Sequence, residues 1–244
     1  MKRSHAVVGI IIILASTFLI EYYTNTRFPI LDYPLTGVPE LEIGETRAFS
    51  YTKAMDNVGT YSYTITSKED GLFTMSSVTN ISYAGENILL ETRFEFDEAY
   101  RPKEYELIIM QGGETNEIQV AFSEGNVIST INLENETATL SDEFPSTAYM
   151  TENNMPGLWE ILLISANLEQ GARYSAEVYI PQGGAMFDLE FYVQNDPQSI
   201  TVDGEQYNCI VIQETTLDLR FYMYEGELVQ MSNIDLDLVF TRIY

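Results

Sequence analysis

The sequence predicts a mainly β protein in which a strongly curved antiparallel sheet, or half-barrel, surrounds one central apolar helix. Three observations support this fold class. Apolar and polar residues alternate along many short segments, turn residues separate these segments at hairpin spacing, and only one segment has the composition of a buried helix. A basic and apolar leader precedes this part of the chain.

The leader has the layout of a secretory signal. Lys2 and Arg3 stand before a mostly apolar run from Ala6 to Ile20, and Tyr22 and Tyr23 follow it. We expect residues 1–23 to be a signal peptide or a signal-anchor helix, and the partial cleavage site favours the uncleaved anchor slightly. The leader predicts an extracytoplasmic protein that is either membrane-anchored by this helix or secreted.

Residues 24–47 are expected to form an extended tether. They include Pro29, Pro34 and Pro39 and show little periodicity. The single antiparallel β domain is then expected to span residues 48–244. Its only cysteine is Cys209, which excludes an intrachain disulfide and an N-terminal lipoprotein cysteine.

Alternation with a period of two predicts the strands of this domain. The inward-facing residues are expected to be Tyr61, Tyr63 and Ile65; Tyr105, Leu107 and Ile109; Ile118, Val120 and Phe122; Tyr174, Ala176, Val178 and Ile180; Phe187, Leu189, Phe191 and Val193; Leu217, Leu219, Phe221 and Met223; and Ile234, Leu236, Leu238 and Phe240. Turns are expected at Asp70-Gly71, Gly112-Gly113, Gly125-Asn126, Gly183-Gly184, Asp203-Gly204 and Glu225-Gly226.

The helix is predicted near residues 155–168. Asn153 or Asn154 would cap its start, Pro156 suits its first turn, and Gly171 would end it. Its side chains are apolar almost all round, with Glu160 as a rare interruption, so most of its surface must be covered. It is predicted to be a core helix that connects two parts of the sheet.

Charge and composition exclude several classes of function. The chain has 37 acidic and 12 basic residues, and this balance argues against nucleic-acid partners. The only histidine is His5, in the leader, so no Ser-His-Asp triad or usual His-ligated zinc site is expected downstream. No phosphate-binding loop or paired CxxC is present. We expect no enzyme activity, no metal and no cofactor.

Carboxylates are the remaining candidates for chemistry. A glycosidase needs two of them on either side of one bond, and two groups were considered: Glu95, Asp97 and Glu98, and the pair Asp235 and Asp237. Neither group has a recognisable glycosidase spacing, so both are interpreted as solvated surface. Asn80 and Asn135 stand in Asn-x-Ser/Thr sequons and would be glycosylation sites in a host that glycosylates.

The chain contains 17 tyrosines, many of them in predicted strands. Aromatic side chains on a curved inner face could line a cavity for an apolar ligand, and β-propensity and core packing are the competing and favoured explanation. The residues predicted to line this cavity are Tyr61, Tyr63, Trp159, Leu162, Tyr174, Phe191 and Phe221.

Several segments resemble an uncharacterised family of exported antiparallel half-barrels, similar in outline to the periplasmic lipoprotein carriers LolA and LolB. The segments are Val58 to Tyr63, Pro156 to Trp159, Gly171 to Tyr174, Val202 to Cys209 and Phe221 to Val229. The resemblance implies a strongly bent sheet that encloses an apolar concavity partly filled by a helix. It implies no catalytic residues.

The leading functional hypothesis is a non-enzymatic extracytoplasmic β domain that binds an apolar small molecule or a protein partner in the cell envelope. A structural or adhesive β-sandwich in a surface assembly is the alternative, and a carboxylate-dependent glycan hydrolase ranks third. An open pocket separates the first two, because the sheets of a sandwich interdigitate without one.

Overall fold

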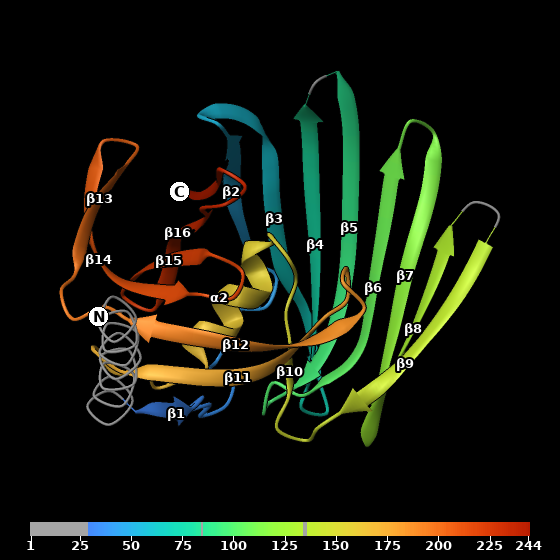
Figure 1. Cartoon of the computed structure of the whole chain (residues 1–244). Helices are drawn as coiled ribbons and strands as arrows, with labels where there is room; N and C mark the ends of the chain where they lie inside the picture. The colour runs from blue at the N-terminus through green and yellow to red at the C-terminus, as the bar shows by residue number, and fades with distance from the viewer. Residues whose placement is uncertain (1–28, 84, 134–135) are drawn as a thin grey trace, which may run out of the picture.

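A computed structural model describes residues 29–83, 85–133 and 136–244 of the chain (Figure 1). The predicted leader, residues 1–23, lies outside the described residues. Among the residues that are described, no helix has the length and apolar character needed to span a membrane.

The described residues form one 17-stranded sheet and the helix α2 (Pro156–Ile164). The strands are β1 (Ile30–Asp32), β2 (Thr46–Lys53), β3 (Asp56–Glu69), β4 (Leu72–Tyr83), β5 (Glu86–Asp97), β6 (Pro102–Gln111), β7 (Glu114–Ser123), β8 (Gly125–Leu133), β9 (Glu136–Phe144), β10 (Tyr149–Met150), β11 (Arg173–Ile180), β12 (Ala185–Val193), β13 (Gln198–Val202), β14 (Glu205–Glu214), β15 (Leu219–Tyr224), β16 (Glu227–Asn233) and β17 (Leu238–Ile243).

The sheet is a long meander that does not close into a barrel. Successive strands from β2 to β9 and from β14 to β17 pair antiparallel. The last strand, β17, pairs with β2 and so connects these two runs of strands in one sheet. The short strands β1 and β10 both run parallel to β11. The sheet is therefore mixed, which corrects the expectation of a purely antiparallel one while confirming a mainly β, strongly curved fold.

The sheet bends around α2 and buries its concave face. In Figure 1 the long strands β4 to β9 form one wall, β11 and β12 cross in front, and α2 lies in the bend between them. The alternating pattern of burial along β3 and β4 shows that every second side chain faces inward. One large apolar cluster fills the space between helix and sheet.

Helix α2 is shorter than predicted and has a different cap. It begins after Met155, which makes no side-chain capping bond, so the expected cap by Asn153 or Asn154 is wrong. It ends at Ser165, whose hydroxyl donates to the Ile161 carbonyl oxygen at 2.6 Å. Gly171 instead takes its positive φ of 78° in the turn before β11. Burial of every residue from Pro156 to Leu163 confirms that the helix is covered on all sides.

Five of the six predicted turns fall between strands, whereas Gly125 and Asn126 already belong to β8 and the turn there is at Glu124. Asp70 and Gly71 have φ values of 51° and 79°, and Asp203 and Gly204 have 50° and 87°, as a two-residue type I′ hairpin requires. Two strands start later than expected, at Leu219 and Leu238. Ile234 and Leu236, which were expected to face the core, lie in the preceding turn and are 53% and 48% exposed.

Much of the predicted tether belongs to the domain. Residues 30–32 form β1, and Tyr33 is buried with its hydroxyl donating to the Leu162 carbonyl oxygen at 3.1 Å. The Thr36 hydroxyl donates to the Ser165 carbonyl oxygen at 2.9 Å. The ring of Tyr33 packs against Phe191 and Tyr149 and fastens this segment to the core.

Candidate functional site

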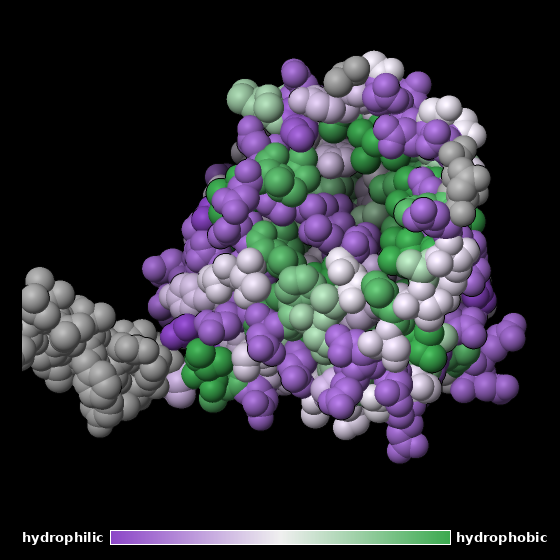
Figure 2. All heavy atoms as spheres, turned by 45° about the vertical axis from the view of Figure 1, so that its right-hand side comes forward, coloured by the Kyte–Doolittle hydropathy of each residue, from purple (hydrophilic) through white to green (hydrophobic). Residues whose placement is uncertain are grey.

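An open apolar hollow lies on the concave face of β4 to β9, at the end of the wall that α2 does not reach. Figure 1 shows these strands extending past the helix, and Figure 2 shows a hollow between hydrophobic flanks in the upper part of the molecule. Strand register places the lining residues on one face, because Leu90 pairs with Ile109 and Ile118 pairs with Ile131. The lining residues are Ile81, Ile88, Leu90, Ile109, Ile118, Ile131, Leu133 and Leu140.

These side chains are only partly covered. Leu133 is 50% exposed and Leu140 is 43% exposed, and the others are half-buried. The inward face of a bent sheet is ordinarily covered by packed side chains, and contiguous exposed apolar surface on a soluble domain marks an interaction site. The hollow is therefore the first candidate for a functional surface.

The inner end of the hollow is polar. There the concave face carries three hydroxyl residues instead of aliphatic ones, and all three are buried: Ser77, Thr79 and Thr92. The Ser77 and Thr92 hydroxyls are 2.6 Å apart and share a hydrogen bond. Thr79 pairs directly with Leu90, so the polar end continues into the aliphatic lining without a gap.

Glu152, in the loop between β10 and α2, completes this polar end. It is fully buried, and its Oε1 accepts a hydrogen bond from the Tyr105 hydroxyl at 3.0 Å. The side-chain amide of Gln182, in the turn between β11 and β12, donates to the same hydroxyl at 3.3 Å. Trp159 Nε1 donates to the main-chain carbonyl oxygen of Glu152 at 2.7 Å and fixes the position of the loop.

Two buried oxygens at this end, Thr79 Oγ1 and Glu152 Oε2, have no hydrogen-bond partner, and Thr151 Oγ1 in the adjoining loop is also unpaired. Leaving a buried polar group unpaired costs about 1–3 kcal/mol, so native proteins rarely tolerate one, and these oxygens need an explanation. The Thr92 hydroxyl is near enough to the Glu152 carboxyl to lower its pKa, but Oε2 makes no hydrogen bond of normal geometry.

Burial decides the charge of Glu152. Removal from water raises the pKa of its carboxyl to about 8, although the hydroxyls of Tyr105 and Thr92 oppose this rise. At neutral pH the side chain is therefore mostly protonated and uncharged. A neutral carboxyl offers one O–H donor as well as acceptor oxygens.

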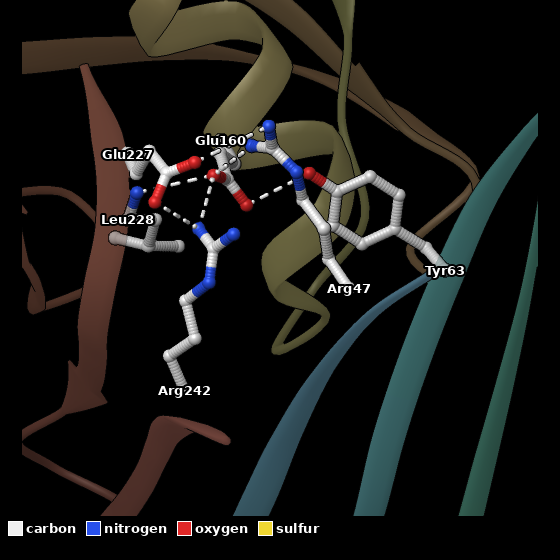
Figure 3. Close-up of polar contacts among 6 residues, drawn as sticks. All are labelled: Arg47, Tyr63, Glu160, Glu227, Leu228 and Arg242. Atoms are coloured by element: carbon white, nitrogen blue, oxygen red, sulfur yellow. Dashed lines mark hydrogen bonds and ion pairs between the residues drawn. The ribbon is translucent and has the colours of Figure 1, made fainter. Parts of the chain in front are cut away.

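A second buried glutamate, Glu160 on α2, is fully paired (Figure 3). Its Oε1 accepts from Arg47 Nη1 at 2.6 Å, from the Leu228 amide at 3.1 Å and from Arg242 Nη1 at 3.3 Å. Its Oε2 accepts from the Tyr63 hydroxyl at 2.8 Å. Glu227 bridges the same two arginines, at 3.5 Å from Arg47 Nη2 and 3.2 Å from Arg242 Nη1.

This ion cluster fastens the helix to the seam where β17 meets β2. Burial lowers the pKa of Arg47, but the Tyr63 hydroxyl, Glu160 and Glu227 more than offset this, so its pKa is raised and its charge is permanent. With both oxygens of Glu160 occupied, the cluster has no free acceptor for a ligand. Its role is structural. In the sequence, Glu160 stood out only as an interruption of an apolar helix, and nothing local identified its distant arginine partners.

The seven residues predicted to line a cavity are brought together, but in the core. All are at most 4% exposed. The Tyr61 hydroxyl accepts from the Gly157 amide at 3.1 Å, and the Tyr174 hydroxyl accepts from the Glu169 amide at 2.9 Å. The indole of Trp159 packs against Phe191 and Phe221. Tyr63 and Leu162 are buried in the same cluster. Contact of these seven with a ligand remains a prediction.

The carboxylates considered for catalysis are spread over the surface. Glu95 pairs with Arg93, and Glu98 with Lys68. Asp97 accepts from the main-chain amides of Ala99 and Arg101. Asp235 and Asp237 lie in the turn before β17 rather than on a strand, which corrects the expected alternation there. Within the described residues, no group of three or more acidic, histidine or cysteine side chains is placed to hold a metal.

The two sequons and the single cysteine are the remaining residues that the sequence singled out. Asn80 is exposed on β4, and Asn135 lies outside the described residues. Cys209 is buried beside Val202 and Val229, and burial raises the pKa of its thiol to about 11. A buried thiol with a raised pKa is an unreactive core residue.

Comparison with known proteins supports the fold alone. The structure is similar to the β-barrel-like protein of DUF1849 from Brucella abortus, with a TM-score of 0.51 and 10% identity over 81% of this chain and 94% of that one. A DUF1089 family protein from Pseudomonas aeruginosa matches with a TM-score of 0.40 and 9% identity, over 81% and 95% of the two chains. No family model and no curated protein matches the sequence. The chain therefore has a β-barrel-like fold in common with a domain of unknown function, and nothing in these matches is specific to LolA or LolB.

Proposed function

We propose that this protein is a non-enzymatic extracytoplasmic domain, secreted or held at the membrane by its N-terminal segment, that binds an apolar ligand in the hollow of β4 to β9. The observation that carries the proposal is the set of half-exposed aliphatic side chains on a concave sheet face. The leader supports the location, and the strongly acidic surface argues against nucleic acids as partners.

The lining favours hydrocarbon. It consists of isoleucine and leucine, and burial of apolar surface contributes about 25 cal/mol for each Å² removed from water, or about 0.8 kcal/mol for each methylene group. A flexible acyl or alkyl chain suits an elongated aliphatic surface better than a sugar does, because few polar groups along it would hold hydroxyls. The packed β-sandwich considered as the alternative does not fit a single curved sheet with an open face.

A protein partner in the cell envelope is the second candidate, and the edge strand β9 favours it. This strand ends the sheet order, and all but its last residue are exposed. An exposed edge presents unpaired main-chain groups on which another chain adds a strand. The charged residues Glu136, Asp142 and Glu143 along it would select against uncontrolled pairing.

The test of ligand binding uses two neighbouring residues that face opposite sides of the same strand. Ile109 lines the hollow, whereas Ile108 faces the convex side and pairs with Glu91 and Glu117. The probe is N-phenyl-1-naphthylamine, an uncharged apolar dye whose fluorescence rises on binding. We expect saturable uptake at micromolar concentration by the wild type and by Ile108→Asn, and about tenfold weaker uptake by Ile109→Asn, which corresponds to about 1.4 kcal/mol.

Wild-type protein that shows no saturable uptake would end the ligand hypothesis. Equal loss in both variants would place the dye elsewhere. The protein-partner candidate would be favoured if Thr139→Pro in β9 abolished the binding of an extended peptide while dye uptake stayed unchanged.

A further inference from the structure

We infer that the polar end of the hollow binds the head of an uncharged amphipathic lipid, with a hydroxyl or carbonyl group seated among Glu152, Thr79 and Thr92 and a hydrocarbon chain along β4 to β8. This inference rests on the proposed function and names the chemical class of its ligand. It comes from the position of the unpaired buried oxygens relative to the aliphatic lining.

Strand register sets the order of the contacts. On the concave face, Thr79 lies between Tyr61 on β3 and Leu90 on β5, and Leu90 is followed by Ile109 on β6. Thr92 lies between Ser77 and Leu107 in the neighbouring row, which continues to Ile118 and Ile131. The first row thus passes from a hydroxyl over two aliphatic side chains and then reaches Asn116 on β7, whereas the second passes from two hydroxyls over three aliphatic side chains. In both rows hydroxyls precede aliphatic side chains, which is the order of groups in an amphipathic lipid.

The two buried glutamates, Glu152 before α2 and Glu160 on α2, differ in how many of their carboxyl oxygens are paired. Glu160 has both carboxyl oxygens occupied by an arginine pair, a tyrosine and a main-chain amide. Glu152 has one occupied oxygen, and its Oε2 is unpaired together with Thr79 Oγ1 and Thr151 Oγ1. A fold that pairs one buried carboxyl fully leaves Glu152 Oε2 and Thr79 Oγ1 open at the end of a hollow, where a ligand would pair with them.

The surroundings of Glu152 favour an uncharged head group. Its hydrogen bonds come from the hydroxyl of Tyr105, and no lysine or arginine contacts it in the described part of the chain. Arg47 and Arg242, which contact the neighbouring helix residue Glu160, are paired with Glu160 and Glu227. An anionic head would therefore have no counter-charge in the hollow, and it would also meet a chain of formal charge −25.

Protonated Glu152 supplies the donor for this contact. The titratable groups that face it are the hydroxyls of Tyr61, Tyr100 and Tyr105, and burial raises the pKa of each well above 10, so they stay neutral. Burial likewise keeps Glu152 protonated below about pH 8. Above that pH the same carboxyl loses its proton, becomes an acceptor only and repels a carbonyl oxygen.

The experiment compares three ligands of equal chain length: decanol, decanoate and decyltrimethylammonium. Each is measured by displacement of N-phenyl-1-naphthylamine at about pH 6.5, below the pKa of Glu152. We expect decanol to bind at least about tenfold more tightly than either charged ligand. We also expect the affinity for decanol to change severalfold as the pH rises through about 8, because the carboxyl then accepts from the decanol hydroxyl instead of donating to it.

Substitutions at Glu152 separate the head-group contact from the hydrocarbon contact. Glu152→Leu is expected to weaken decanol about tenfold while dye uptake persists, and Glu152→Gln, which keeps an uncharged donor, is expected to stay within about threefold of the wild type. Far-UV circular dichroism, which reports the β-sheet and not the surroundings of Glu152, verifies that each variant is folded. The wild-type pH profile gives the same information without any variant.

Three outcomes would overturn the inference. They are equal affinity for the neutral and anionic ligands, preference for the cationic ligand, and decanol binding that is unaffected by both Glu152→Leu and pH. Each leaves the proposed function standing, provided that the dye binds. Absence of dye uptake by the wild type is the separate result that removes the proposed function itself.

Discussion

Trp159 Nε1 lies 2.7 Å from the main-chain carbonyl oxygen of Glu152 and donates a hydrogen bond to it. The bond ties the core face of α2 to the loop that carries the unpaired carboxyl. Both residues are fully buried. The position of Glu152 at the end of the hollow therefore depends on the packing of the helix, and the indole is a natural reporter of changes at that carboxyl.

Ionisation of Glu152 should lower the stability of the fold. In the folded protein its pKa is raised by burial from 4.5 to about 8, so between these values the folded state holds a proton that the unfolded state has released. The free energy of unfolding should then fall by about 1.4 kcal/mol for each pH unit across this window, and level off above it.

Urea unfolding followed by Trp159 fluorescence measures this dependence. The matched control is Glu152→Gln, which cannot ionise and should lose this part of the slope. Contributions from other groups, such as Glu214 with its raised pKa, remain in both proteins and cancel in the difference. Parallel curves for the two proteins from about pH 5 to 8 would show that Glu152 is already ionised in the folded state.

Removal of Glu160 should destabilise the protein far more than removal of Glu227. Both glutamates contact Arg47 and Arg242, but Glu160 is fully buried, whereas the Glu227 side chain is 39% exposed. Glu160→Ala leaves the two guanidinium groups without their buried partner and is expected to cost about 3–5 kcal/mol. Glu227→Ala is expected to cost at most about 1 kcal/mol, because solvent screens an exposed pair.

Chemical denaturation of the two variants at neutral pH gives the comparison directly. High salt should reduce the small loss of stability caused by Glu227→Ala and leave the larger loss caused by Glu160→Ala nearly unchanged. Similar losses for both variants would contradict the assignment of Glu160 as the residue that fastens α2.

Gly157 should tolerate no larger residue, because α2 approaches β3 closely there. A Cβ atom at this position would lie 2.3 Å from the Tyr61 hydroxyl oxygen and 2.9 Å from Tyr63 Cδ1. Gly157→Ala would push the helix away from both tyrosines, with a loss of about 1–3 kcal/mol in the free energy of unfolding.

Gly183 provides the control for this substitution. It has an ordinary φ, and a Cβ there would lie 3.5 Å from the nearest atom of Phe187, which is normal contact. Gly183→Ala should therefore change stability by less than about 0.5 kcal/mol. A thermal shift assay on the two variants suffices, and equal midpoints would refute the close approach at Gly157.

Part of the candidate site was accessible to sequence reasoning. Alternation correctly placed Leu107 and Ile109 on one face of β6, and Ile118 on the same face of β7. The aromatic residues were expected to line the cavity, yet Tyr61 and Trp159 fill the core. Period two assigns a side chain to a face of a strand, but it does not say which part of that face a distant helix will cover.

The sequence by itself determined the strands, their turns and the buried nature of the helix, because these depend on neighbours along the chain: side-chain alternation, glycine at positive φ and apolar character all round. Tertiary structure decided the parallel pairing of β1 and β10 with β11, the ion cluster at Glu160 and the unpaired oxygen of Glu152. These features join residues that lie far apart in the sequence, such as Arg47 and Arg242, which are 195 positions apart. The interaction energies of these groups depend on their burial and on the distances between them, and both are set only when the sheet bends around α2.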